Sequence, residues 1–253
     1  RDLFVIIFKY MKQIVLQTIL VLIFIILSIL YFYDVFGIPE IDKTFLTLST
    51  FLFALFTGFF IARQATRYSD IRKLTANFDG IMSSTYRAYQ HYGANAQKSV
   101  GEIISKHYKK TIKGGWDYHL KNKSTTLTDI HTLTENVVSE SGTDGIKSSV
   151  TNRIILGLHD AQKIRKNMVA LHDERIPGFQ MRLIYLLTII LVVMVSTVPS
   201  IELLLGSLVK SAFVTSVIVV VILLKRLDSL ELFAGGIGEK SAQDVVNIIE
   251  GKR

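Results

Sequence analysis

The chain has 253 residues, 49% of them hydrophobic, and a formal net charge of +8. It contains no cysteine, which excludes disulfides and thiolate metal sites. The positive mean hydropathy of +0.38 indicates a membrane protein rather than a soluble domain. In a membrane protein, a basic excess more often faces anionic lipid than nucleic acid. We therefore expect the lipid bilayer as a partner and no nucleic acid.

Four apolar runs are long enough to cross a bilayer as helices. None carries an ionisable residue near its middle, which argues against a proton-coupled pump or a transporter with a buried charge. The runs are Ile14–Tyr33, Phe45–Ala62, Met181–Val198 and Ser207–Leu224. The sequence thus predicts an all-α polytopic membrane protein with four transmembrane helices.

Basic residues flank the same side of the predicted bilayer: before the first run, after the second, before the third and after the fourth. The positive-inside rule then places both termini and the long middle segment in the cytoplasm of a plasma-membrane protein. The predicted organisation is a first transmembrane pair (1–62), a cytoplasmic helical domain (63–180), a second transmembrane pair (181–224) and a cytoplasmic C-terminal segment (225–253).

The middle segment shows helical periodicity and no trustworthy strand alternation. Apolar residues recur at spacings of three and four in several stretches, the first of which continues the second apolar run. Gly114 and Gly115 interrupt the pattern, and Pro177 with Gly178 ends the last helix before the third run. The predicted helical stretches are Ile71–Tyr89, Val100–Tyr108, Thr128–Ser139 and Val150–Leu171.

Sites for enzymatic or metal chemistry are not evident. The middle segment holds six histidines, but no Glu-x-x-His pattern that would indicate a metal site in a helical bundle. The run Gly235–Ser241 resembles a phosphate-binding loop, but Glu239 lies between the last glycine and the lysine, which breaks the required spacing. We interpret it as a turn in which Ser241 caps a helix that ends at Ile249. We predict no enzyme, no cofactor and no metal; a membrane enzyme would need at least two histidines to converge.

The second apolar run has two distinct faces at helical spacing. Small and hydroxyl residues share one face: Thr47, Thr50, Ala54, Thr57 and Gly58. Large apolar residues share another: Leu52, Phe56 and Phe60. Small residues let helices pack closely, whereas hydroxyls can also line water beside a ring of large apolar residues that gates by dewetting. Both interpretations stay open.

A basic stretch follows this run at once. No glycine or proline lies between Phe59 and Ile71, so we expect one helix to cross the membrane and continue into the cytoplasm. The basic residues that would begin a cytoplasmic vestibule are Arg63, Arg67, Arg72 and Lys73.

Several short segments resemble one known family. They are Gly58–Ala62, Arg67-Tyr68-Ser69-Asp70 with Arg72, Tyr86 and Tyr89, Ile103–Tyr108 followed by Trp116, Asp173–Pro177, Leu227-Asp228 and Gly235. Together they resemble the bestrophin-like family of four-span membrane proteins, distant relatives of bestrophin ion channels.

The resemblance implies a large cytoplasmic helical part between the second and third spans. Bestrophins are pentameric channels that mostly conduct anions such as chloride, and their second helix lines the pore with an apolar aromatic neck. The resemblance therefore implies a homo-oligomer, a pentamer, that handles inorganic ions, with Phe56 or Phe60 in the neck. The acidic cluster that binds calcium in animal bestrophins is not evident here.

The function predicted from the sequence is an oligomeric, anion-conducting ion channel. Its expected pore-lining or gate residues are Thr50, Leu52, Phe56, Thr57 and Phe60. The alternative is a membrane-anchored scaffold or sensor whose cytoplasmic helices bind a partner, which predicts a second span closed by tight packing with no central water path.

Overall fold

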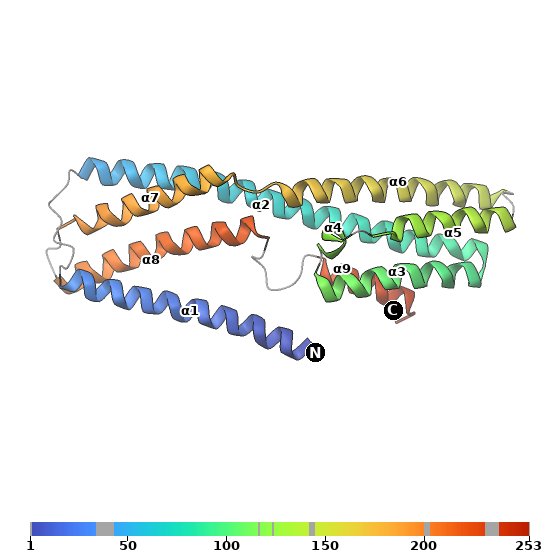
Figure 1. Cartoon of the computed structure of the whole chain (residues 1–253), viewed down its shortest axis with the longest axis horizontal. Helices are drawn as coiled ribbons and strands as arrows, with labels where there is room; N and C mark the ends of the chain where they lie inside the picture. Colours follow the sequence, from blue (N-terminus) through green and yellow to red (C-terminus); the bar gives the residue numbers. More distant parts are fainter. Residues whose placement is uncertain are drawn as a thin grey trace. The chain divides into compact units, whose positions relative to one another are not determined.

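The computed structural model describes residues 2–33, 43–115, 117–122, 124–141, 145–199, 203–230 and 238–252. Within these ranges every regular element is a helix, so the predicted all-α class is confirmed (Figure 1). The elements in chain order are α1 (Asp2–Phe32), α2 (Lys43–Ala88), the 3₁₀ helix η1 (Tyr89–Tyr92), α3 (Ala94–Gly114), α4 (Tyr118–Lys121), α5 (Thr126–Ser141), α6 (Ile146–Asp173), α7 (Gly178–Ser196), α8 (Leu203–Asp228) and α9 (Glu239–Ile249).

The predicted spans Phe45–Ala62 and Ser207–Leu224 fall within α2 and α8, whereas Ile14–Tyr33 and Met181–Val198 extend one and two residues past the ends of α1 and α7. Among the described residues, three helical segments are long and apolar enough to cross a membrane, judged by length and composition: Thr44–Tyr92, Gly178–Ser196 and Leu203–Asp228. The apolar segment Thr18–Phe32 of α1 is shorter. The structure thus provides several apolar helices, while the count of four spans remains a prediction.

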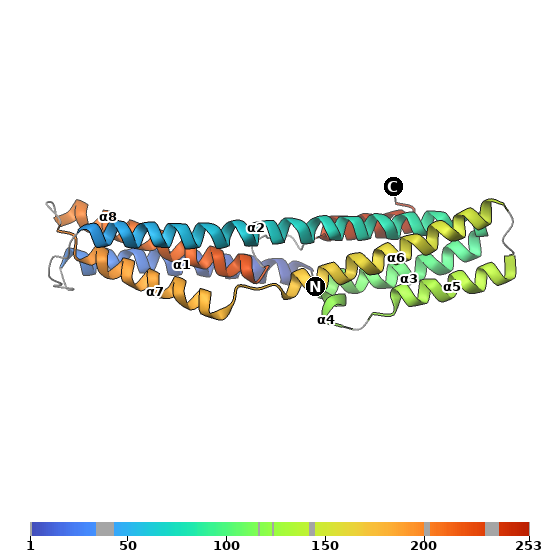
Figure 2. The same cartoon turned by 90° about the horizontal axis from the view of Figure 1, so that it is seen from above.

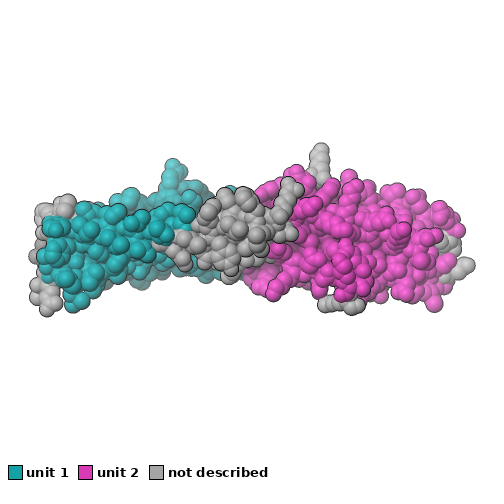
Figure 3. Space-filling view, turned by 90° about the horizontal axis from the view of Figure 1, so that it is seen from below, with its two compact units in different colours: residues 1–66, 175–234 teal, residues 67–174, 235–253 magenta. Residues whose placement is uncertain are grey.

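The helices form two compact units (Figure 3). Unit 1 comprises Arg1–Thr66 and Arg175–Ala234 and holds α1, the first part of α2, α7 and α8. Helix α8 packs against both α1 and α7 (Figure 1). The unit's core is built from apolar side chains of all four helices: Tyr31, Phe53, Phe60, Ile176, Ile184, Leu187, Leu191, Val195, Val214, Val217 and Leu224.

Polar contacts inside unit 1 link helices that are distant in sequence. The hydroxyls of Tyr31 on α1 and Ser196 on α7 lie 3.1 Å apart in a buried hydrogen bond. The Lys210 ammonium lies 5.7 Å from the centre of the Tyr31 ring, close enough for a cation–π contact. Lys210 therefore has an aromatic partner in its own unit.

Unit 2 comprises Arg67–Glu174 and Gly235–Arg253. Helix α3 packs against α5 and α9, and α5 packs against α6. Its core contains residues of the stripes that the sequence predicted: Phe78, Tyr89, Val100, Ile104, Tyr108, Ile154, Leu158, Ala161 and Met168. It also contains residues outside those stripes: Met82, Ile130, Ala242, Val245 and Val246. The helical periodicity of the middle segment is thus confirmed, and the C-terminal helix α9 supplies part of the same core.

Helix ends follow the predicted breakers with one correction. Helix α3 ends at Gly114, and α7 begins at Gly178 directly after Pro177. The predicted cap of α9 is wrong: the helix begins at Glu239 with Gly238 as N-cap, and Ser241 lies inside its first turn. Gly238 has φ +73°, and a Cβ there would lie 2.4 Å from Thr75, so both backbone conformation and space require glycine. Gly235–Ile237 lie outside the described residues.

Candidate functional site

Helix α2 is the element that the candidate site is built on. It runs for 46 residues from Lys43 to Ala88 without interruption (Figure 2). About 20 residues suffice to cross the hydrocarbon core of a bilayer, so the helix is much longer than one crossing needs. The predicted continuous helix through the basic stretch is confirmed. Its first part belongs to unit 1 and its second part to unit 2.

One face of α2 in unit 1 points into that unit's core. Phe53, Thr57 and Phe60 are 6%, 3% and 4% exposed, and the neighbouring polar residues Ser49 and Gln64 are also buried. The Thr57 hydroxyl donates to the Phe53 carbonyl oxygen at 2.6 Å, so it is satisfied within the helix. Of the predicted pore-lining residues, Thr57 and Phe60 are therefore buried inside unit 1.

The opposite face carries a row of large apolar side chains spaced by four. Phe51, Leu55 and Phe59 are 61%, 54% and 61% exposed. A spacing of four advances about 40° around a helix, so these three side chains stack along one line of the surface. We call Phe51, Leu55 and Phe59 the apolar row.

Small residues lie beside the apolar row on the same exposed face: Thr47, Ala54, Gly58 and Ala62. Among the described residues, and apart from the neighbouring backbone of α2, no atom lies within 4 Å of a Cβ added at Gly58. The remaining predicted pore-lining residues, Thr50, Leu52 and Phe56, are half-buried at the edges of the face. Phe51, Leu55 and Phe59 were missed because a helix that is apolar all round gives no periodic signal for which side meets the core.

The predicted vestibule charges differ in their surroundings. Arg63, Arg72 and Lys73 are exposed. Lys73 forms an exposed ion pair with Asp70 at 3.6 Å. Arg67, by contrast, is only 4% exposed and therefore does not present its charge on the surface of unit 2.

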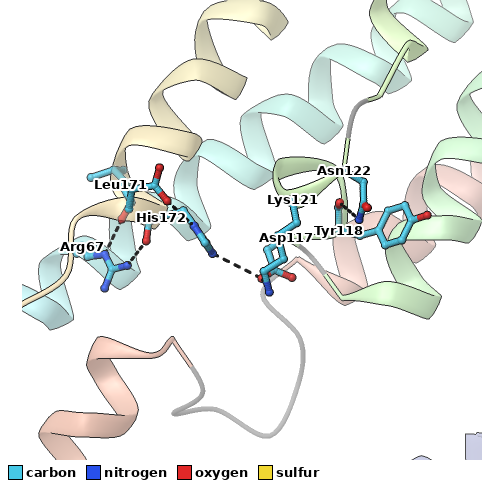
Figure 4. A network of polar contacts seen from close by, with 8 residues as sticks. Arg67, Asp117, Tyr118, Lys121, Asn122, Leu171 and His172 are labelled. Carbon is cyan, nitrogen blue, oxygen red and sulfur yellow. Dashed lines mark hydrogen bonds and ion pairs between the residues drawn. The ribbon is translucent and has the colours of Figure 1, made fainter.

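Arg67 binds the C-terminal end of α6 (Figure 4). Its Nε donates to the Leu171 carbonyl oxygen at 2.6 Å, and its second guanidinium nitrogen donates to the His172 carbonyl oxygen at 2.7 Å. The last carbonyls of a helix have no partner within the helix and carry a partial negative charge. The planar guanidinium satisfies two of them at once, which a lysine cannot do in the same geometry.

The polar network continues from the His172 side chain to the segment around α4 (Figure 4). Its Nε2 lies 3.6 Å from an Asp117 carboxylate oxygen, and its Nδ1 lies 3.0 Å from Asp173. Asp117 also pairs with Lys121 on α4. The end of α6 is therefore fixed by Arg67 of α2 through its backbone carbonyls, and by Asp117, the residue before α4, through the His172 side chain.

A buried carboxyl lies on α2 within unit 2. Asp79 is 4% exposed, and its Oδ1 accepts a hydrogen bond from the Tyr108 hydroxyl of α3 at 2.6 Å. Burial raises the pKa of Asp79 to about 6, against the opposing effect of the Ser241 and Tyr108 hydroxyls. Burial beside Asp79 also raises the pKa of Tyr108. This carboxyl therefore joins α2 and α3.

Two of the segments quoted for the family resemblance meet in unit 1. The backbone amide of Ile176, in the Asp173–Pro177 segment, donates to Oδ1 of Asp228 at 2.8 Å. Ile176 itself is buried in the unit 1 core. The Asp228 carboxylate thus anchors the start of α7 to the end of α8.

The histidines of unit 2 have separate neighbours. His131 pairs with Glu135, and His107 lies 3.0 Å from the Thr126 hydroxyl. Over the residues that the structure describes, no group of three or more His, Asp or Glu side chains is placed to hold a metal ion.

Comparison with known proteins supports the fold and the family. Two variants of a bacterial bestrophin homologue from Klebsiella pneumoniae superpose with TM-scores of 0.69 and 0.66 at 13% identity, over 95% of this chain and 98% of theirs. A variant of a structure described as a membrane protein superposes with a TM-score of 0.64 at 15% identity, over 92% of this chain and 96% of its own. A comparison with curated proteins found no match. The family model of the bestrophin-like domain matches residues 9–238. The chain therefore belongs to the bestrophin-like family.

Proposed function

We propose that this protein is the subunit of an oligomeric ion channel in which α2 lines the pore. The observation that carries the proposal is the apolar row on the exposed face of α2, beside small residues. A ring of such side chains makes a constriction that gates by dewetting. Membership of the bestrophin-like family and the fold shared with bacterial bestrophin homologues support a channel.

A pore of this kind needs several copies of the chain around an axis, because one α2 cannot enclose a water path. The small residues Ala54, Gly58 and Ala62 would let the α2 helices of neighbouring copies approach closely. The apolar row lies beside these small residues on the same face of α2, and it would then point toward the axis of the pore. We propose a pentamer in the plasma membrane with both termini in the cytoplasm, as the family resemblance and the positive-inside rule imply.

The channel is tested by reconstitution of the purified protein in liposomes with a chloride flux assay. Phe59→Ala widens and wets the constriction, so we expect the flux to change by roughly threefold or more. The matched control is Ile189→Ala on α7, because Ile189 is as exposed as Phe59, at 61%. It should leave the flux unchanged.

Absence of any flux, or a monomer in detergent, would contradict the channel. Equal effects of Phe59→Ala and Ile189→Ala would contradict only the pore-lining role of the apolar row, and would indicate that this row faces lipid. Absence of flux from a stable oligomer would instead favour the membrane-anchored scaffold or sensor.

We further propose that the exposed charges Arg72 and Lys73 favour anions. A basic surface raises the local anion concentration through its field. Arg72→Gln combined with Lys73→Gln should lower the ratio of chloride to potassium permeability, measured as a reversal potential in planar bilayers under a salt gradient. Lys163→Gln with Lys166→Gln, two exposed lysines of α6, is the control. An unchanged ratio in the first variant would contradict the contribution of Arg72 and Lys73.

A further inference from the structure

A groove of about 640 Å³ runs along α3 in unit 2. Its walls come from α3 and the end of α9, with Tyr86 of α2 contributing to the lining. Five lysines line it against two glutamates: Lys98, Lys106, Lys109, Lys110 and Lys113, with Glu102 and Glu250. Its volume lies in the range of pockets that bind small molecules.

Four of the five lysines lie between Lys106 and Lys113, in the last part of α3. Lys106 and Lys110 are one turn apart, as are Lys109 and Lys113. Like charges at this spacing repel each other, and the negative end of the helix offsets this repulsion only in part. A bound anion would remove this repulsion.

Acidic side chains neutralise only part of this charge. Glu250 pairs with Lys109 at 3.3 Å and with Lys252 at 2.6 Å, so its carboxylate is already shared by two ammonium groups. In the described part of the chain, Lys106, Lys110 and Lys113 form no ion pair. The basic end of the groove therefore keeps an uncompensated positive charge.

The lining also includes a less polar region. A Cβ at Gly101 would lie 3.0 Å from the Tyr86 ring and 3.2 Å from Ile249, so glycine lets both side chains approach α3 closely. The Tyr86 hydroxyl donates to the Ile249 carbonyl oxygen at 3.4 Å. Ser105 adds a half-exposed hydroxyl to the lining. The groove thus offers apolar contact beside its cluster of cations.

We propose that this groove binds a small ligand with two or more phosphate groups, which Lys106, Lys110 and Lys113 hold while Tyr86 and Ile249 contact its organic part. Clustered ammonium groups favour a ligand that carries several negative charges on compact groups, and lysine binds phosphate as a compact point charge. The phosphates can belong to a soluble molecule or to a lipid headgroup.

The test is isothermal titration calorimetry on the full chain in nonionic detergent. Sodium tripolyphosphate represents the soluble source, and dioctanoyl phosphatidylinositol bisphosphate represents the lipid source. We expect at least one probe to bind, and the tighter probe identifies the source. Lys106→Gln with Lys110→Gln should weaken binding by about tenfold or more, whereas Lys163→Gln with Lys166→Gln on α6 should leave the Kd within about twofold.

A second variant separates a shaped site from a diffuse basic surface. Ser105→Phe fills the groove without changing its charge and should also weaken binding about tenfold. The proposal is overturned if neither probe binds below about 1 mM, which corresponds to about −4 kcal/mol. It is also overturned if both lysine pairs weaken binding equally, or if Ser105→Phe has no effect.

Discussion

Arg67→Ala is expected to lower the free energy of unfolding of unit 2 by about 3 kcal/mol. The substitution removes two short, charge-assisted hydrogen bonds and leaves the Leu171 and His172 carbonyls at the end of α6 without these donors. Thermal unfolding of the purified protein in detergent should show a fall in Tm of roughly 10 °C. The change should appear as a loss of total helical signal at a lower temperature, measured by circular dichroism.

Two further variants make this expectation specific. Arg67→Lys keeps a positive charge near the negative end of α6 but cannot donate to both carbonyls in the same fork, so we expect an intermediate Tm. Arg72→Ala, an exposed arginine of the same helix, should change stability by no more than about 0.5 kcal/mol. Equal Tm values for Arg67→Ala and Arg72→Ala would show that the cap of α6 does not contribute to stability.

Asp79→Asn is expected to stabilise unit 2 at neutral pH and to remove part of its pH dependence. The pKa of Asp79 rises from 3.8 to about 6 because the carboxyl is buried, so the folded state holds this proton more tightly than the unfolded state. Stability then falls as the pH rises from about 4 to about 6 and stays lower above that window. Two pKa units correspond to about 3 kcal/mol.

The measurement is chemical unfolding of the wild type and Asp79→Asn at several values between about pH 4 and pH 8, spanning the two pKa values. The curves should converge at low pH, where Asp79 is protonated and neutral like asparagine, and separate above pH 6. Asp160→Asn, which removes an exposed carboxylate of α6, is the control and should leave the profile unchanged. Parallel curves for wild type and Asp79→Asn across this range would contradict the raised pKa.

Tyr108→Phe tests the direction of the hydrogen bond in the same site. The Tyr108 hydroxyl donates to the Asp79 carboxylate and so opposes the rise in the Asp79 pKa. Without this hydroxyl, the fall in stability with rising pH should extend to higher pH than in the wild type. In Asp79→Asn this fall should be absent. A step at lower pH would mean that the hydroxyl does not stabilise the charged form.

The sequence by itself determined where the helices lie. The apolar runs coincide closely with α7 and α8. Gly114 is the last residue of α3, and Pro177 directly precedes α7. These signals are local: a bilayer sets the length of an apolar run, and glycine and proline alter the backbone at their own positions. Ile154, Leu158, Ala161 and Met168 of the predicted α6 stripe are buried, as their periodicity predicts, although Ile155 and Leu156 of the same helix are exposed.

Only the tertiary structure decided which side of α2 meets the core. Large apolar residues occur all around its first part, so periodicity cannot choose between Phe59 and Phe60, which are adjacent in sequence. In unit 1, packing buries Phe60 among the α7 and α8 side chains and leaves Phe59 exposed. The candidate pore row therefore differs by one position from the row that the sequence suggested.

Tertiary structure also decided the roles of two charged residues and of the last helix. Arg67 and Asp79 look like surface charges in the sequence, but the carbonyls of α6 and the hydroxyl of Tyr108 lie close to them only in the folded chain. Helix α9 is amphipathic in sequence, yet its partner α3 lies more than 120 residues earlier. Contacts over such separations depend on the packing of whole helices, which no local pattern of residues specifies.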